Sequence, residues 1–265
     1  MKLAISNIAW EASKDFEVYK LMEKYGFYGL EIAPTRLISD KPYDRIDEAE
    51  KLTGELKSLY NFEICSMQSI LYGRTENIFE SRESRKNITQ YLIKAIDFAA
   101  AVSCRNMVFG CPKNRYMTKE EDYEVAVDFF KELAEYALKK GTVISIEANP
   151  SMYGTNFINY TREAVGIVKD VNSKGFKVNL DFGTMIANGE SVDEIIDHVD
   201  YINHVHISEP GLLPICQRRE HRELASLLRE KCYKGFVSIE MKKEEKDFPD
   251  NIERTMNYIA ETFGD

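Results

Sequence analysis

Four side chains with metal-binding chemistry stand near the ends of short apolar segments, and we call them the quartet: Glu147, Asp181, His206 and Glu240. The segments read VISIEAN, KVNLDF, INHVHIS and GFVSIEM, and the four residues are 34, 25 and 34 positions apart. Each interval is about the length of one strand followed by one helix, so such strand ends can meet at one edge of a parallel sheet. Three carboxylates and an imidazole held together repel strongly unless a divalent cation neutralises them. The pattern therefore predicts a metal-dependent enzyme.

Alternation along a strand supports this grouping, because every second residue faces the same side. Ser145 shares a face with Glu147, and His204 shares a face with His206. Any one of these polar residues taken alone is better explained as a solvated strand end or a structural hydrogen-bonding group than as a metal ligand. Burying a lone glutamate in an Ile-rich strand is costly, however, and four such residues at four strand ends favour a shared ligand.

The elements that must position the quartet form a repeated pattern along the whole chain. Short segments rich in Val, Ile and Phe alternate with longer amphipathic segments of helical period. The predicted strands cover residues 3–9, 29–33, 63–69, 105–110, 143–149, 177–182, 202–208 and 235–241. The predicted helices cover residues 15–25, 44–60, 81–102, 119–140, 160–173, 191–199, 219–231 and 250–262.

Eight strand–helix units without an intervening linker predict an α/β fold, a single (β/α)₈ TIM barrel spanning residues 1–265. In such a barrel the functional groups lie at the C-terminal ends of the strands. A doubly wound open sheet is the alternative. It is disfavoured because the first strand is followed by SNIAWEASKD, which lacks a glycine-rich phosphate-binding turn.

Composition excludes several classes of function. The chain has 44% hydrophobic and 30% charged residues, as soluble globular proteins do, and its net charge of −9 disfavours nucleic-acid binding. No segment approaches 18 apolar residues and the N-terminus has no signal sequence, so we expect a cytoplasmic protein without a membrane anchor.

The five cysteines form no C-x-x-C pair and are expected to be reduced, with Cys111 placed to line a pocket.

The quartet also carries a resemblance to a known family. The segments IEANP at 146–150, NLDFGT at 179–184, HVHISEP at 204–210 and GFVSIEM at 235–241 resemble the xylose isomerase-like superfamily of sugar and sugar-phosphate isomerases and epimerases. GLEIAP at 29–34 is a weaker match. The ordered set of four residues is the specific feature, and the resemblance extends over essentially the whole chain and includes D-tagatose 3-epimerase-like members.

The resemblance implies that the quartet binds one divalent cation. Oxygen-rich ligation with one imidazole favours Mn²⁺ or Mg²⁺, with Co²⁺ or Zn²⁺ as alternatives. The cation would polarise a substrate carbonyl and stabilise an enediolate, while Glu147 and Glu240 act as the acid and base of an isomerisation or epimerisation. The expected partner is a small-molecule sugar, and the resembling proteins are usually dimers or tetramers, so a homo-oligomer is possible.

The chain departs from the ketose 3-epimerase pattern at three positions. Those members carry an acid six residues after the first ligand, a histidine three residues after the ligand Asp, and an arginine six residues after the ligand His. This chain has Tyr153, Thr184 and Leu212 there. The departures leave the metal ligands intact and predict a different substrate or a different way of holding it.

Four further residues are predicted to bind substrate from other strand ends. Trp10, the only tryptophan, could floor the pocket against a sugar face, and Gln68 could hydrogen-bond a hydroxyl. Arg115 could bind a phosphate or carboxylate, although an ordinary surface arginine is the simpler explanation. His221 could reach the site or cap its helix.

Three other functions compete with the isomerase hypothesis. A dehydratase of a polyhydroxylated ketone would use the same metal and enolate chemistry but expel a hydroxyl group. A non-catalytic ligand-binding barrel would hold no metal. The apurinic endonucleases of the same superfamily need extra histidines for three zinc ions, where this chain has Gln68, Gly110 and Thr184.

Overall fold

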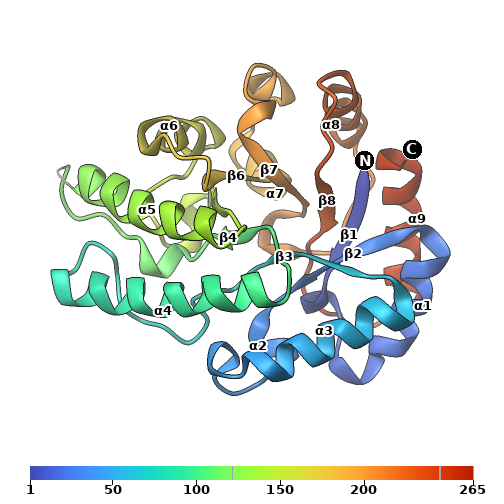
Figure 1. Ribbon diagram of the computed structural model, residues 1–265. Coiled ribbons are helices and arrows are strands. Elements are labelled where there is room, and N and C mark those ends of the chain that lie inside the picture. The colour runs from blue at the N-terminus through green and yellow to red at the C-terminus, as the bar shows by residue number, and fades with distance from the viewer. Residues whose placement is uncertain (121, 245, 265) are drawn as a thin grey trace.

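Eight parallel strands close into a barrel in the order β1 to β8, as the sequence predicted (Figure 1). The computed structural model describes residues 1–120, 122–244 and 246–264. The strands are β1 Lys2–Ser6, β2 Phe27–Ile32, β3 Glu63–Met67, β4 Met107–Phe109, β5 Ile144–Glu147, β6 Phe176–Asp181, β7 Ile202–Ile207 and β8 Phe236–Ile239. β1 pairs with both β2 and β8, which closes the barrel.

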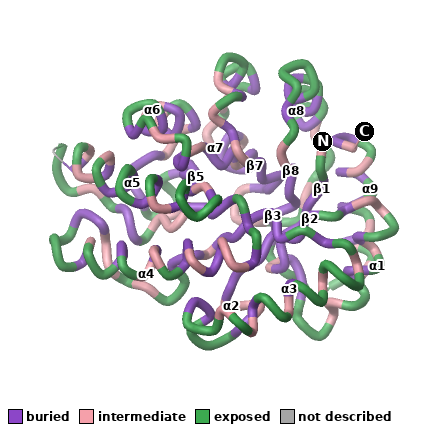
Figure 2. Tube along the Cα trace, viewed as in Figure 1, coloured by how far each residue is buried: buried purple, intermediate pink, exposed green. Residues whose placement is uncertain are grey.

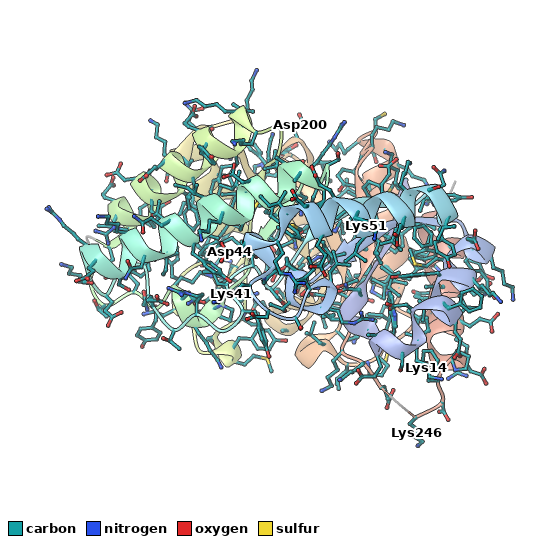
Figure 3. The ribbon with its side chains drawn as sticks, turned by 60° about the horizontal axis from the view of Figure 1, so that its bottom comes forward. Lys14, Lys41, Asp44, Lys51, Asp200 and Lys246 are labelled. Carbon is teal, nitrogen blue, oxygen red and sulfur yellow. The ribbon has the colours of Figure 1, made fainter. Side chains whose placement is uncertain are left out.

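Helices surround the barrel on its outside (Figure 1). They are α1 Asp15–Tyr25, α2 Pro34–Leu37, α3 Ile46–Tyr60, α4 Arg82–Ala101, α5 Asp122–Lys139, α6 Thr161–Val171, α7 Phe182–Asn188, α8 Arg219–Glu230 and α9 Asp250–Phe263. Charged side chains such as Lys51 on α3 and Asp200 before β7 point away from the molecule (Figure 3). Within the described residues, no helix is long and apolar enough to cross a membrane.

The main difference from the predicted elements lies between β6 and β7. The predicted helix over 191–199 is wrong, because that stretch forms two short 3-10 helices, Val192–Ile195 and Val199–Tyr201. The helix of this unit is α7, which starts directly after β6, where Asp181 accepts a hydrogen bond from the backbone N–H of Thr184. Gly189, in the left-handed conformation, ends α7.

Smaller differences occur at other element ends. The first strand ends at Ser6 instead of residue 9, because Asn7–Ala9 form a 3-10 turn. The Asn7 side chain accepts a hydrogen bond from the backbone N–H of Ala33 and so ties this turn to the end of β2. Residue 121, inside the predicted helix over 119–140, lies outside the described residues.

The apolar core is one cluster of buried side chains from the strands and from the helices packed around them (Figure 2). Aromatic rings fill the layer between α5 and the strands. The ring centroids of Phe130 and Phe176 are 4.7 Å apart in a stacked arrangement, and Phe109 meets Phe130 edge-on at 5.0 Å. This packing holds β6, which carries Asp181, and β4, which pairs with the strand that carries Glu147.

Close packing of α5 against the start of β6 predicts a stability effect at Gly175. A Cβ atom there would lie 2.0 Å from the carbonyl oxygen of Ala134 on α5, so backbone must move. We expect Gly175→Ala to lower the free energy of unfolding by about 1–3 kcal/mol in urea titrations. Gly166→Ala is the matched control, because a Cβ in the middle of α6 has nothing within 4 Å and should stabilise by about 0.5–1 kcal/mol. Equal effects of the two substitutions would contradict this packing argument.

Candidate metal centre

The structure brings the quartet together at the C-terminal mouth of the barrel. Each of its residues offers one ligand atom, and these four atoms all lie within 4.8 Å of one another. Glu147 and Asp181 end β5 and β6, His206 is next to last in β7, and Glu240 follows β8. Asp181 pairs in register with His206, so neighbouring strands deliver their polar ends at one level. All four come from different strands, as expected for a barrel site.

His206 is held by carboxylates on both sides of its ring. Its Nε2 lies 2.9 Å from Oε2 of the buried Glu31 on β2. Its Nδ1 lies 3.1 Å from Oε2 of Glu147 and 3.3 Å from Oε2 of Glu240. A proton on Nε2 shared with Glu31 leaves Nδ1 as the nitrogen that faces the other ligands, which is the arrangement used by metal-binding histidines.

Two further polar groups extend this support below the quartet. Nε2 of His204 lies 3.2 Å from Oε2 of Glu31, and Gln68 donates to Oε1 of Glu31 at 3.2 Å and to Oγ of Ser6 at 2.8 Å. Glu31, His204 and His206 also lie close enough to form a second group of potential ligands. Because His206 belongs to both groups, we interpret Glu31 and His204 as its support.

Hydrogen bonds also orient the carboxylates. Asp181 accepts from the backbone N–H of Thr184 at 2.5 Å and from Oγ of Ser208 at 2.6 Å. Glu147 accepts from Nδ2 of Asn149 at 2.9 Å through Oε1 and from Nδ2 of Asn179 at 2.7 Å through Oε2. Both carboxylates are therefore fixed before any ligand enters.

The concentration of negative charge perturbs the titration of the site. Burial, together with repulsion from Glu147, raises the pKa of Asp181 to about 6, and burial with the same repulsion raises the pKa of Glu240 to about 7. Burial alone would lower the pKa of His206, but the charges of Glu31 and Glu240 raise it well above its ordinary value. Burial would raise the pKa of Glu31, yet His206 and His204 hold it well below the ordinary range.

This donor set fits a divalent cation. The protein itself opposes the quartet's three carboxylates with one imidazole, and two of these carboxyl groups respond by binding protons more tightly. An ion with two positive charges would remove that penalty, and three carboxylates with one imidazole suit a hard or borderline ion.

The quartet carboxylates open into a cavity of about 580 Å³, a size typical of small-molecule sites. Glu147, Asp181 and Glu240 lie in its wall, while His206 is buried behind them. The other lining residues include Gln68, Leu71, Val108, Cys111, Pro112, Tyr153 and Leu212. The wall around the quartet carboxylates exposes more apolar than polar surface, although Arg74, Lys113 and Asn149 also line it, and Cys111 lines the cavity as its position in the sequence predicted.

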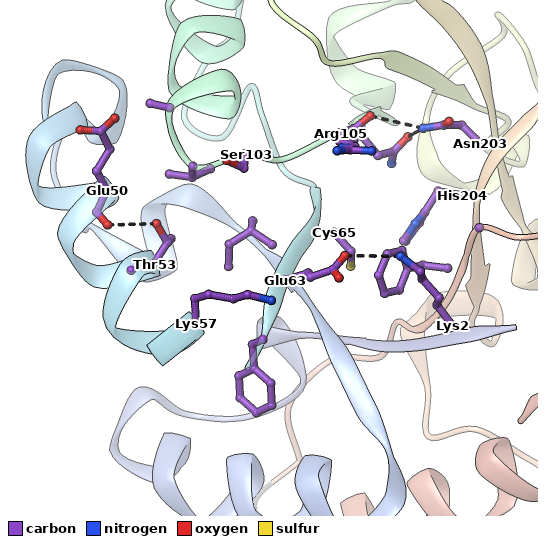
Figure 4. Close-up of a pocket in the computed structure, with 18 of the residues that line it drawn as sticks. Lys2, Glu50, Thr53, Lys57, Glu63, Cys65, Ser103, Arg105, Asn203 and His204 are labelled. Carbon is purple, nitrogen blue, oxygen red and sulfur yellow. Dashed lines mark hydrogen bonds and ion pairs between the residues drawn. The ribbon is translucent and has the colours of Figure 1, made fainter. Parts of the chain in front are cut away.

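A second cavity of about 640 Å³ lies at the opposite end of the barrel (Figure 4). It is lined by residues at the starts of strands, such as Lys2 on β1 and Glu63 on β3, which lie 3.5 Å apart as an ion pair. It contains none of the quartet. Size therefore does not distinguish the two cavities, whereas the quartet carboxylates line only the cavity at the C-terminal mouth.

Of the four residues predicted to bind substrate, only Gln68 lines the cavity at the quartet. Trp10 is buried, donates from Nε1 to Oδ1 of Asp15 at 2.7 Å and meets Tyr19 edge-on, so it packs beneath α1 instead of flooring the pocket. This placement corrects the sequence-based expectation for Trp10.

His221 and Arg115 also lie outside the cavity. His221 is buried beside Phe182, and its Nδ1 lies 3.0 Å from the hydroxyl of Tyr258. Burial lowers the pKa of His221 to about 4. Arg115 is completely buried and donates to backbone carbonyls and to Asn149, so its guanidinium is not open to a substrate. The structure therefore corrects the expectation that Arg115 and His221 reach a substrate at the mouth.

Sequence analysis missed the two asparagines that hold Glu147. Asn149 and Asn179 each stand two positions from a quartet residue, Asn149 after Glu147 and Asn179 before Asp181. The alternation rule puts residues two apart on the same face, so a search for amide groups at this spacing would have found both.

Comparison with known proteins agrees with this geometry. Residues 19–262 match the family model described as xylose isomerase-like TIM barrel. The chain belongs to this family. No curated protein sequence matches the chain significantly.

Solved structures share the fold over nearly the whole chain. A 3-keto-D-glucoside 4-epimerase from E. coli is 20% identical with a TM-score of 0.79 and covers 98% of both chains. D-psicose 3-epimerase from Clostridium cellulolyticum, solved with D-tagatose, is 19% identical with a TM-score of 0.81, covering 100% of this chain and 98% of the other. A probable 3-DHS dehydratase from Bacillus anthracis is 16% identical with a TM-score of 0.71, covering 97% of each chain. At these identities the likeness establishes the fold.

The perturbed groups predict how the stability of the metal-free protein depends on pH. Between about pH 8 and pH 6.5 the folded protein binds protons on Glu240, Asp181 and His206 that the unfolded chain binds only at lower pH. The folded state therefore carries more protons, and the free energy of unfolding should rise as the pH falls through this window. His204 and His221, whose pKa values are lowered by burial, begin to oppose this rise near the lower end of the window, and Glu31, whose pKa is also lowered, opposes it at more acidic pH.

Urea titrations in the presence of a chelator at about pH 8 and about pH 6.5 measure this change in the free energy of unfolding. Glu240→Gln should reduce the change between the two pH values, because the amide does not titrate. Glu63→Gln, at an exposed carboxylate in the opposite cavity, should leave it unchanged. Equal or greater stability of the metal-free wild type at about pH 8 would contradict the interpretation.

Proposed function

We propose that this chain is a divalent-metal-dependent isomerase or epimerase of a small sugar or sugar derivative. The observation that carries the proposal is the convergence of the quartet in the wall of the 580 Å³ cavity, with ligand atoms within 4.8 Å of one another. The family supports it, as do the neighbouring structures, two of which are named as sugar epimerases.

The proposed metal ligands are the quartet residues, with Mn²⁺ or Mg²⁺ as the preferred ion. A bound divalent ion supplies Lewis acidity toward a substrate carbonyl and its adjacent hydroxyl. His206 contributes Nδ1, because Glu31 occupies its Nε2 side. Hydrogen bonds from Thr184 and Ser208 hold the Asp181 carboxylate in place.

Glu147 and Glu240 are the proposed proton-transfer residues. One takes the proton from the carbon beside the carbonyl, and the other returns a proton to the neighbouring or opposite position. Both carboxylates face the cavity. Burial raises the pKa of Glu240 to about 7, and a group that titrates near neutral pH both accepts and donates protons efficiently.

The positions that differ from ketose 3-epimerases shape the proposed substrate site. Leu212 contributes an apolar side chain to the cavity wall, and Thr184 donates its hydroxyl to the carbonyl of Ala148. The Tyr153 hydroxyl lines the cavity and accepts from the backbone N–H of Gly211 at 2.7 Å. A wall of this kind favours a sugar derivative with a less polar portion over a free ketohexose.

Deuterium exchange tests the metal and the acid–base chemistry together. Purified protein loaded with Mn²⁺ should exchange the proton beside the carbonyl of a ketose or keto-glycoside in D₂O, measured by NMR across a substrate panel. A chelator should abolish the exchange, and Glu147→Gln or Glu240→Gln should slow it by about 10²–10⁴-fold, because each removes one proton-transfer group. Glu63→Gln should exchange at the wild-type rate, since its carboxylate lies in the opposite cavity.

Other results would exclude the proposed reaction. Exchange at the wild-type rate in both Gln variants would exclude these residues as acid and base. A product lighter by one water molecule would identify a dehydratase, the activity named for one of the neighbouring structures. A wild-type protein that binds sugars but no metal would be a ligand-binding barrel.

A further inference from the structure

Arg115 is a buried cation whose hydrogen bonds all go to uncharged groups. It follows β4, is completely buried, and takes part in no ion pair among the described residues. Its guanidinium donates to the carbonyl oxygens of Gly110 at 2.6 Å, Glu147 at 2.8 Å and Phe157 at 2.5 Å, and to Oδ1 of Asn149 at 2.7 Å. It thus joins the end of β4, the end of β5 and the loop after β5.

A charge in this position is costly. Burial without a carboxylate partner destabilises the charged form, and accordingly burial lowers the pKa of Arg115 to about 10. The group still carries its proton at neutral pH. An apolar side chain would avoid that penalty but would leave the carbonyl oxygens of Gly110, Glu147 and Phe157 without this donor, which is one reason for the guanidinium.

The contact with Asn149 provides a second reason for a guanidinium at this position. An asparagine side chain presents an oxygen at one end and an NH₂ group at the other, and the two ends are interchanged by a flip. Because Arg115 donates to Oδ1 of Asn149, the NH₂ end must face Glu147, where it donates to Oε1 at 2.9 Å. A flipped amide would point its oxygen at the carboxylate and repel it.

The surroundings of Glu147 leave little freedom for another arrangement. A Cβ atom on Gly110 would lie 2.9 Å from Oε1 of Glu147, so glycine makes the room that this carboxylate occupies. Arg115 binds the carbonyl of the same glycine and the carbonyl of Glu147 itself. One side chain therefore fixes the backbone that carries Glu147 and the amide that orients its carboxylate.

We propose that Arg115 is a positioning residue for Glu147 that acts through Asn149 and keeps the metal centre preformed. This inference rests on the proposed metal site. It replaces the sequence-based expectation that Arg115 binds a substrate phosphate or carboxylate.

Binding of Mn²⁺ alone tests the inference without any knowledge of the substrate. We expect Arg115→Met and Asn149→Ala each to weaken Mn²⁺ binding by about 10–100-fold in calorimetric titrations, the effect typical of lost support behind a metal ligand. The double variant should bind about as weakly as either single variant, because both substitutions remove the same linkage. Arg115→Lys should fall between, since an ammonium keeps the charge but not the planar fork.

Arg229→Met is the matched control. Arg229 also donates to backbone carbonyls, those of Thr262 at 2.9 Å and Gly264 at 2.8 Å, but at the far side of the molecule between α8 and α9. We expect this variant to lose some stability in urea and to keep wild-type Mn²⁺ affinity. The electron paramagnetic resonance spectrum of bound Mn²⁺ should change in the Arg115 and Asn149 variants and stay the same in Arg229→Met.

The outcomes separate this inference from the proposed function. If the wild type fails to bind Mn²⁺, the metal site itself is wrong. If the wild type binds and the folded Arg115 and Asn149 variants bind equally well, the positioning role is wrong. Additive losses in the double variant would overturn the link through Asn149. If Arg115→Met does not fold, Arg115→Lys and Asn149→Ala decide the question.

Discussion

Negative charge gathered in a buried place is the constraint on which this structure depends. Glu147, Asp181 and Glu240 face one another at the mouth, and Glu31 lies below them on the other side of the His206 ring. Taking carboxylates out of water and placing them side by side both favour the protonated forms. The His206 imidazole lies between the two layers and contacts Glu31, Glu147 and Glu240, and His204 also contacts Glu31. The site is consequently built to receive further positive charge.

The barrel makes this concentration of charge unavoidable. Parallel strands deliver their C-terminal ends to one rim, and the register of β6 with β7 sets Asp181 level with His206. Asp181 also fixes the segment that follows β6, because its side chain caps the first turn of α7. The geometry of the quartet and the local folding of the chain are thereby coupled, and a change at Asp181 affects both.

Sequence reasoning succeeded where a residue lies on a regular strand and failed where a loop decides. The strand ends of the quartet follow from alternation and from the length of a strand–helix unit, so the barrel and the convergence were predictable. Trp10 and Arg115 stand in turns beyond strand ends, where no periodicity tells whether a side chain turns toward the mouth or back into the core. His221 lies in the first turn of α8 on the buried face that includes Leu224 and Ala225, so helical spacing could have indicated its burial. In each case the structure shows the side chain turned into the protein. The apolar packing around such residues is a tertiary property that spacing does not encode.

The two glutamates of the site are restrained to different degrees, and this asymmetry has a consequence for function. Glu147 accepts hydrogen bonds from two amides, one at each carboxylate oxygen, and Arg115 secures the first of these amides. Glu240, by contrast, has His206 as its one side-chain partner within the described residues. A carboxylate held at both oxygens keeps a fixed position, while one held at a single point is free to adjust as substrate enters. Under the proposed function, Glu147 therefore serves as the rigid reference for the metal, and Glu240 as the group that follows the reacting carbon.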